Sequence, residues 1–225
     1  MTAAFSPPAA ASSSLLDARS DGIVQTVTIE SSLVARAAAF AKLAHRGQVR
    51  KEANGGPYFV HPEGVARLLQ EHGVTDEVVL AAAYLHDVIE DQPAWTQELR
   101  TQFPRDVVAT VELVTERKLD AAGRRRPKGE RFAEYLAALR GDAPQVEQAR
   151  LVSCADKVHN LQTLLVAERA GDHLLERLNT PPDQYPVQLS ALRDVYATTV
   201  PTPLLETFDR TVRQLLAYLE EREHA

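Results

Sequence analysis

The amino-acid sequence predicts an all-α protein. Apolar residues recur every three or four positions in most segments, as they do along one face of an amphipathic helix. No stretch alternates apolar and polar residues over the length that a half-buried strand needs, and no internal repeat is present. The length of 225 residues predicts one domain with a tail. We expect a disordered N-terminal tail over residues 1–20 and the domain over residues 21–225.

The composition excludes several classes of protein. The chain is 44% hydrophobic and 25% charged, as is typical of ordinary globular proteins, and no apolar run is long enough to span a membrane. Its 25 basic and 31 acidic residues give a net charge of -6, which argues against a surface built for duplex nucleic acid. Cys154 is the only cysteine, so an internal disulfide is impossible and a cytoplasmic location is expected. Nothing in the sequence indicates an oligomeric state.

The first two helices are predicted on either side of a turn-rich loop. A capping serine, Ser31 or Ser32, precedes a helical pattern over residues 33–47. Residues 48–62 contain the run Asn-Gly-Gly-Pro, which turns the chain. Pro62 then opens the second helical pattern, because proline is favoured in the first turn of a helix.

The rest of the chain is also predicted to be helical. Thr75 or Asp76 caps a strongly apolar segment that continues to residue 91, and its length and alanine content favour a buried helix over a strand. The further helical patterns cover residues 96–103, 105–116, 131–141, 146–170 and 203–221.

Three carboxylates and an imidazole gather at the polar end of this apolar helix. They belong to His86, Asp87, Glu90 and Asp91. Residues three and four apart share a helix face, so these groups are expected to lie close together. Burying like charges costs several kcal/mol per ion unless positive charge compensates, and acidic groups at a helix C-terminus also oppose its dipole. A divalent metal ion is the natural compensating charge.

Two further residues fit such a metal site. Asp156 is a second carboxylate stranded in an apolar helix, and Asn160 and Thr163 follow it on the same face. His61 stands next to Pro62, which stiffens the chain there. Two imidazoles and two carboxylates suit manganese, iron or zinc better than calcium or copper(I). Coordination positions would remain for water and substrate.

Several motifs in this order resemble the hydrolase domain of the RelA/SpoT alarmone enzymes. They are GQVRK and PYFVHP upstream, the His-Asp pair with its trailing Glu90 and Asp91, and ADKVHNLQTL downstream, within residues 31–215. The chain is similar to the small alarmone hydrolases, which consist of the hydrolase domain alone. The resemblance implies an HD-domain helical bundle that binds one Mn²⁺ ion and removes the 3′-pyrophosphate from the nucleotides ppGpp or pppGpp.

The resemblance also implies a role for each site residue. The implied metal ligands are His61, His86, Asp87 and Asp156. The implied catalytic pair is Glu90 and Asp91. The implied nucleotide contacts are Arg50, Lys51, Asn160 and Thr163. A bound metal lowers the pKa of water, so the acidic pair is expected to orient that water and to assist proton transfer, without a fixed division of labour.

Two alternatives concern the substrate and the activity. Gln162 stands where many family members have arginine, in an order like HNMRT, so an adenosine alarmone or another 3′-phosphorylated nucleotide is an alternative substrate. The second alternative is a degenerate HD domain that binds an alarmone without hydrolysing it. The intact Glu90 and Asp91 argue against that alternative.

Other polar residues have two interpretations. The basic run from Arg124 to Lys128, with Arg131 and Tyr135 after it, either clasps the pyrophosphate or is merely solvated. His45 and His159 are expected to support the site through hydrogen bonds rather than to bind the metal.

Overall fold

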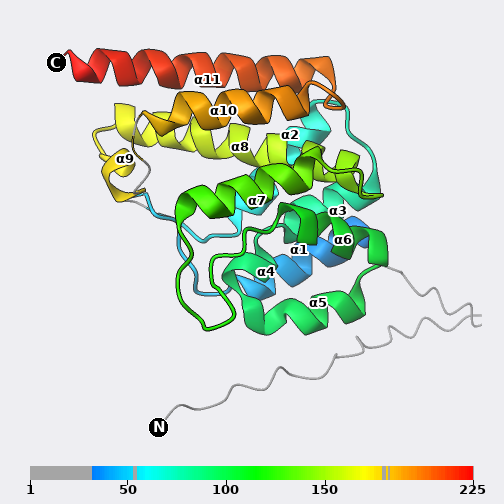
Figure 1. The fold of residues 1–225 in the computed structure, drawn as a ribbon. Helices are drawn as coiled ribbons and strands as arrows, with labels where there is room; N and C mark the ends of the chain where they lie inside the picture. The colour runs from blue at the N-terminus through cyan, green and yellow to red at the C-terminus, as the bar shows by residue number, and fades with distance from the viewer. Residues whose placement is uncertain (1–31, 53–54, 179–180, 182, 225) are drawn as a thin grey trace, which may run out of the picture. The chain divides into compact units, whose positions relative to one another are not determined.

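Helices make up nearly all of the regular structure in the computed structural model, which describes residues 32–52, 55–178, 181 and 183–224 (Figure 1). The elements are α1 (Leu33–Ala44), α2 (Val60–Glu71), α3 (Glu77–Leu85), α4 (Val88–Asp91), the 3₁₀ turn η1 (Pro93–Trp95), α5 (Thr96–Gln102), α6 (Arg105–Val114), α7 (Lys128–Arg140), α8 (Val146–Arg169), α9 (Leu174–Arg177), α10 (Gln184–Tyr196) and α11 (Thr202–Glu223). Extended pairing over the described ranges is limited to isolated bridges. The all-α prediction is therefore confirmed, while the predicted tail, residues 1–20, lies outside the described residues.

Two of the predicted helix caps are present. The Ser32 hydroxyl accepts a hydrogen bond from the backbone N–H of Ala35 at 3.2 Å, at the start of α1. The Asp76 carboxylate accepts one from the N–H of Val78 at 2.8 Å, at the start of α3. Gly47, with φ +81°, takes the chain out of α1 in a left-handed conformation that only glycine adopts without steric cost.

Several predicted boundaries are wrong, among them the start of α7, at Lys128 rather than at residue 131. Helix α2 begins at Val60 rather than at Pro62, because a proline also fits within the first turn, where backbone N–H groups have no partner in the helix. The predicted helix over residues 76–91 divides into α3 and α4 at His86. The His86 ring nitrogen Nδ1 lies 2.8 Å from the carbonyl oxygen of Ala83, the acceptor that the next backbone N–H would use in a continuous helix.

The sequence patterns do not predict α9 and α10. Helix α10 buries Leu189, Leu192, Val195 and Tyr196, which are spaced as on one helix face. Three prolines between residues 181 and 186 hide this pattern, because the third of them lies inside the first turn of α10.

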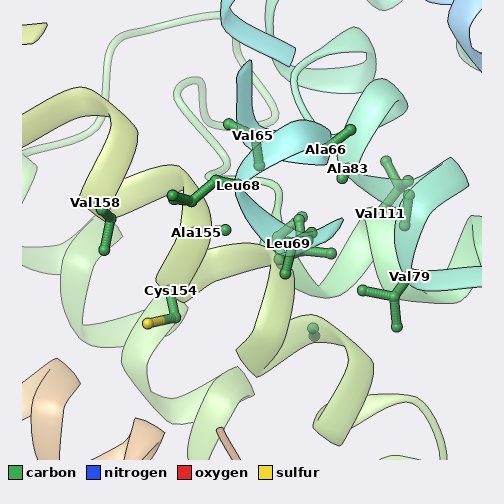
Figure 2. Close-up of a cluster of buried hydrophobic side chains, with 14 of the residues drawn as sticks. Val65, Ala66, Leu68, Leu69, Val79, Ala83, Val111, Cys154, Ala155 and Val158 are labelled. Carbon is green, nitrogen blue, oxygen red and sulfur yellow. The ribbon is translucent and has the colours of Figure 1, made fainter. Parts of the chain in front are cut away.

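The core lies where α2, α3, α6 and α8 meet. Helix α3 packs against α1, α2, α6 and α8, and its alanines 81–83 are fully buried, which lets neighbouring helices approach closely. Figure 2 shows Leu69 of α2 among apolar side chains of α3, α6 and α8, including Val79, Val111 and Ala155. This packing fixes α2, the end of α3 and the middle of α8 next to one another.

Helices α10 and α11 lie side by side and cover α8 on the side away from α4 and α5 (Figure 1). Helix α8 thus packs against α10 and α11 as well as against α2, α3 and α6, and its middle turns carry polar residues into the bundle. No helix in the described part of the chain is both long and apolar enough to cross a membrane.

Candidate active site

Four side chains from three parts of the chain converge at the centre of the bundle. His61 Nε2, from α2, lies 3.2 Å from His86 Nε2 at the end of α3 and 3.1 Å from Asp156 Oδ1 of α8. Asp87 Oδ2 lies 3.4 Å from His61 Nε2 and 3.2 Å from His86 Nε2. Ligand atoms that share one ion at about 2.1 Å lie about 3.0–3.4 Å apart. The separations therefore fit a divalent metal ion between His61, His86 and Asp87, with Asp156 Oδ1 next to the two imidazoles.

The charges at this centre also favour a cation. Burial opposes ionisation of Asp87, but the neighbouring His86 and His61 outweigh it and hold the pKa of this carboxyl well below its usual range. Burial opposes ionisation of Asp156 too, and Lys157 with the two histidines lowers its pKa well below the usual range. For His86, burial is outweighed by Asp87 and Asp156, which raise its pKa. A proton on this imidazole supplies the positive charge that a bound metal ion would replace.

Hydrogen bonds direct the two imidazoles toward the centre. His86 Nδ1 donates to the carbonyl oxygen of Ala83, so Nε2 is the nitrogen that would bind a metal when the metal replaces its proton. His61 Nδ1 lies 3.0 Å from Nδ1 of His159. Burial and the nearby His61 lower the pKa of His159 to about 4, so its neutral ring can accept this bond. His159 is therefore placed as a support, as expected, and so is His45, whose Nδ1 lies 2.8 Å from Gln48 Oε1.

Gly64 makes room for this support. A Cβ atom at Gly64 would lie 2.2 Å from His159 Nε2. We expect Gly64→Ala to push His159 away from His61 and to weaken Mn²⁺ binding by roughly 10- to 100-fold, the usual effect of losing a hydrogen bond to a metal ligand. Competition titration against a chromophoric chelator measures this change. Gly129→Ala is the matched control, since nothing lies within 4 Å of that position. Equal Mn²⁺ affinity in both variants would contradict this role for His159.

Three neighbours fix the carboxylates. The Tyr58 hydroxyl donates to Asp87 Oδ2 at 2.5 Å, and burial together with Asp87 raises the pKa of this phenol so that it keeps its proton. Asn160 Nδ2 donates to Asp156 Oδ1 at 2.6 Å, and Lys157 Nζ lies 3.0 Å from Oδ2. Sequence reasoning missed Tyr58, although it stands three residues before a predicted metal ligand, within PYFVHP.

Lys118 joins the predicted catalytic pair. Its Nζ lies 2.9 Å from Glu90 Oε1 and 2.7 Å from Asp91 Oδ1, both on α4. Burial and Asp87 raise the pKa of Glu90, while Lys118 acts in the opposite direction. Gln48 Nε2 holds the other oxygen of Asp91 at 2.9 Å. Sequence reasoning also missed Lys118, whose only signal was its place at the start of the basic stretch after α6.

These residues line one large cavity, here called the main cavity, of about 820 Å³. Its lining includes His86, Asp87, Glu90, Asp91, Asp156 and the predicted nucleotide contacts Arg50, Lys51 and Asn160. Thr163 is not part of this lining, and Leu164 takes its place one turn after Asn160. The volume is within the usual range for small-molecule sites. The main cavity thus joins three of the four metal-binding candidates, the acidic pair and most of the predicted substrate contacts.

Arg50 enters this lining with partners of its own. Its Nη2 lies 3.0 Å from Glu52 Oε1 and 3.4 Å from Asn160 Oδ1, and its guanidinium carbon lies 5.7 Å from the centre of the Tyr58 ring. Since Asn160 in turn donates to Asp156, Arg50 connects the loop before α2 to a metal-binding candidate. This geometry gives a ligand phosphate or base a fixed guanidinium rather than a mobile one.

The basic run after α6 divides between two functions. Arg124 pairs with Asp120 at 2.8 Å and Arg126 pairs with Glu134 at 2.5 Å, so these two hold the loop together. Arg125 and Lys128 line the main cavity instead. Arg131 and Tyr135 after them also belong to its lining but are buried, at 5% and 6% exposure. The Tyr135 hydroxyl bonds to Ser153.

Comparison with known proteins supports the same interpretation. The family model described as HD domain matches residues 37–179. The mouse protein named guanosine-3′,5′-bis(diphosphate) 3′-pyrophosphohydrolase MESH1 is 41% identical over 136 residues, which cover 60% of this chain and 71% of that protein. GTP pyrophosphokinase rsh of Brucella melitensis is 36% identical over 137 residues, 60% of this chain and 17% of that one. The solved structure of a metazoan orthologue of SpoT, described as hydrolysing ppGpp, is 32% identical, with a TM-score of 0.66 over 84% of this chain and 98% of that chain.

Proposed function

Because the chain belongs to the HD-domain family, in the group of small alarmone hydrolases, we propose that it hydrolyses ppGpp and pppGpp to GDP or GTP and pyrophosphate. The observation that carries this proposal is the set formed by His61, His86 and Asp87, whose ligand atoms lie 3.2 to 3.4 Å apart, with Asp156 Oδ1 3.1 Å and 3.5 Å from the two imidazoles and the Glu90–Asp91 pair in the adjoining main cavity. A degenerate binding domain would not need both the ligand set and the acidic pair.

His61, His86 and Asp87, together with Asp156, would hold one Mn²⁺ ion. When bound there, the ion would supply Lewis-acid activation of water and of the phosphoryl group. The mixed nitrogen and oxygen donors suit manganese, as they also suit iron or zinc. The two ionised carboxylates and the two oriented Nε2 atoms are the features of the chain that fit such an ion.

The protein's own groups carry the proton and the phosphates. Glu90 and Asp91 orient the attacking water toward the phosphorus on the ribose 3′ oxygen, and one of them takes its proton. The raised pKa of Glu90 makes it a stronger base than an ordinary carboxylate, and the charge of Lys118 reduces the repulsion between the two acids. The bond between this phosphorus and the 3′ oxygen breaks, the 3′ oxygen takes up a proton as it leaves with the nucleoside 5′-phosphates, and the oxygen of the water departs in the released pyrophosphate.

Cations around the main cavity are proposed to bind the remaining phosphates. Arg50 and Lys51 approach from the loop before α2, Arg125 from the α6–α7 loop and Lys128 from the first residue of α7. They give a protein of net charge -6 a local positive surface, which an anionic nucleotide needs. Asn160 completes the proposed contacts, while a contact by Thr163 stays a prediction from the resemblance alone.

The adenosine alternative depended on Gln162. In the structure this residue is exposed and does not line the main cavity, so its replacement of an arginine removes no cation from the cavity wall. The structure therefore offers no observation that favours adenosine alarmones over guanosine alarmones as the substrate class.

A substrate panel tests the proposed function. Mn²⁺-loaded protein is incubated with ppGpp, pppGpp, ppApp, pppApp and NADPH, and the products are identified by chromatography. We expect the guanosine alarmones to give GDP or GTP with pyrophosphate, and exhaustive chelation to stop the reaction until Mn²⁺ is restored. Faster turnover of ppApp would favour the adenosine alternative. Full activity after chelation, or binding without turnover of any nucleotide, would refute the proposed hydrolysis.

A further inference from the structure

The loop between α6 and α7 holds both oxygens of Glu90. The backbone N–H of Glu116 donates to Glu90 Oε2 at 3.0 Å, and Lys118 Nζ lies 2.9 Å from Oε1. The same ammonium reaches Asp91 at 2.7 Å. Residues 116–118 therefore decide where the acidic pair lies relative to the metal-binding candidates. A displacement of this short segment would carry both contacts with it.

A buried ion pair closes the base of this loop. Arg131, in the first turn of α7, places Nη1 3.0 Å from Glu116 Oε2 and is only 5% exposed. Its Nε is buried without a hydrogen-bond partner among the described residues. The charge of Arg131 is therefore compensated chiefly by Glu116, and a buried arginine without its partner would be strongly unfavourable. This dependence fixes the Glu116 side chain, and with it the backbone N–H that binds Glu90.

Arg131 differs from the neighbouring cation Arg125 in its exposure to solvent. Arg125 belongs to the same cavity lining but is exposed, as a side chain that meets a soluble anion should be. The Arg131–Glu116 pair instead forms part of the wall between the main cavity and a second cavity of about 350 Å³, since both residues line both spaces. A guanidinium built into a wall and paired with a carboxylate is suited to fix structure rather than to bind substrate.

We infer that Arg131 is a positioning residue for the proposed hydrolysis, acting through Glu116 on Glu90. The kinetic consequence of this inference rests on the proposed function, whereas the contacts that link Arg131 to Glu90 do not depend on it. Arg131 holds Glu116, the Glu116 N–H holds Glu90 Oε2, and Lys118 two residues later holds the acidic pair from the other side. Loss of Arg131 is expected to misplace the acidic pair without removing a substrate contact.

Kinetics of two single variants and their combination test this role. With Mn²⁺-loaded protein, Arg131→Met and Glu116→Gln are each expected to lower kcat by roughly 100-fold, the scale of a small misplacement of a catalytic group. KM should stay within about threefold of the wild type, because substrate contacts are kept. The double variant should be no worse than the worse single variant. Arg131→Lys, which keeps the charge, should recover most of the lost kcat. If Arg131→Met raises KM, Glu116→Gln does not, and the effects of the two substitutions add in the double variant, Arg131 is a substrate contact and the inference is overturned.

Hydrogen–deuterium exchange supplies a measurement that needs no activity. Arg131→Met is expected to speed exchange in the peptide covering residues 115–119, because the Glu116 N–H loses its fixed acceptor. Arg100→Met is the matched control, since it removes an exposed pair with Glu112 at 2.7 Å on α5 and α6. Unchanged exchange with unchanged kcat would overturn the inference. A wild type that hydrolyses no nucleotide would refute the proposed function, and the exchange would still decide whether Arg131 holds the loop. If Arg131→Met does not fold, Glu116→Gln, which breaks the same ion pair from its other side, provides the same comparisons.

Discussion

Asp87→Ala is expected to abolish turnover and Mn²⁺ binding together, whereas Glu90→Gln is expected to slow turnover by roughly 100- to 10,000-fold and to keep the metal. Asp87 contributes one of four converging ligand atoms, and its removal also leaves the Tyr58 hydroxyl without its acceptor. Glu90 instead faces Lys118 and the Glu116 N–H, so its amide variant keeps the shape but loses a site for the proton. Metal analysis, steady-state rates and calorimetry with the nucleotide separate these effects.

Asp142→Ala is the control for this pair of variants, because Asp142 is an exposed acid between α7 and α8. It should match the wild type in metal content and rate. Retained Mn²⁺ with an undiminished rate in Asp87→Ala would exclude Asp87 from the metal site. Loss of the metal in Glu90→Gln would show that Glu90 is a ligand rather than a group that handles the proton.

Lys118→Met is expected to lower kcat by roughly 100-fold and to move the acidic limb of the pH–rate profile to higher pH. Burial and Asp87 already raise the pKa of Glu90, and Lys118 is the neighbour that lowers it. Without the ammonium the pKa of Glu90 rises further, so the carboxyl stays protonated up to a higher pH. The fraction of enzyme with an ionised Glu90 therefore falls at any given pH below the new pKa. The measurement is kcat as a function of pH with the metal kept saturating.

Lys42→Met provides the comparison for this variant, because Lys42 is an exposed lysine on α1 that packs over the Phe59 ring. Its profile should coincide with that of the wild type. An acidic limb that stays in place in Lys118→Met would mean that the titration seen in the rate does not belong to Glu90.

The sequence was sufficient for most helices and singled out candidate metal-binding residues, for a shared physical reason. Helix periodicity is a local property, so α1, α6, α8 and α11 follow from spacing alone. A carboxylate such as Asp156 inside an apolar helix is equally visible, because it conflicts with its surroundings. That Asp156 would meet His61 and His86 required the family resemblance, since no local pattern states which helices pack together.

The contacts that sequence reasoning missed are long-range or depend on helix geometry. Lys118 reaches Asp91 of the acidic pair across 27 residues of sequence, and a lysine in a basic stretch gives no sign of such a partner. Thr163 was expected to share a helix face with Asp156, which it follows by seven residues. The lining of the main cavity instead includes Asp156, Asn160 and Leu164, which are four residues apart along α8. The end of α3 at His86 depends on a side-chain hydrogen bond that periodicity cannot express.

The spacing of the four ligand candidates along the chain has a consequence for folding. Residues 61 and 156 are 95 positions apart, so one ion bound to both would act as a reversible cross-link across a long loop. Closing such a loop restricts the unfolded chain, and an ion that binds only the folded form favours that form by mass action. The metal concentration would then set the fraction of folded protein as well as its rate. Starvation for the ion would reduce the amount of enzyme, not merely its turnover.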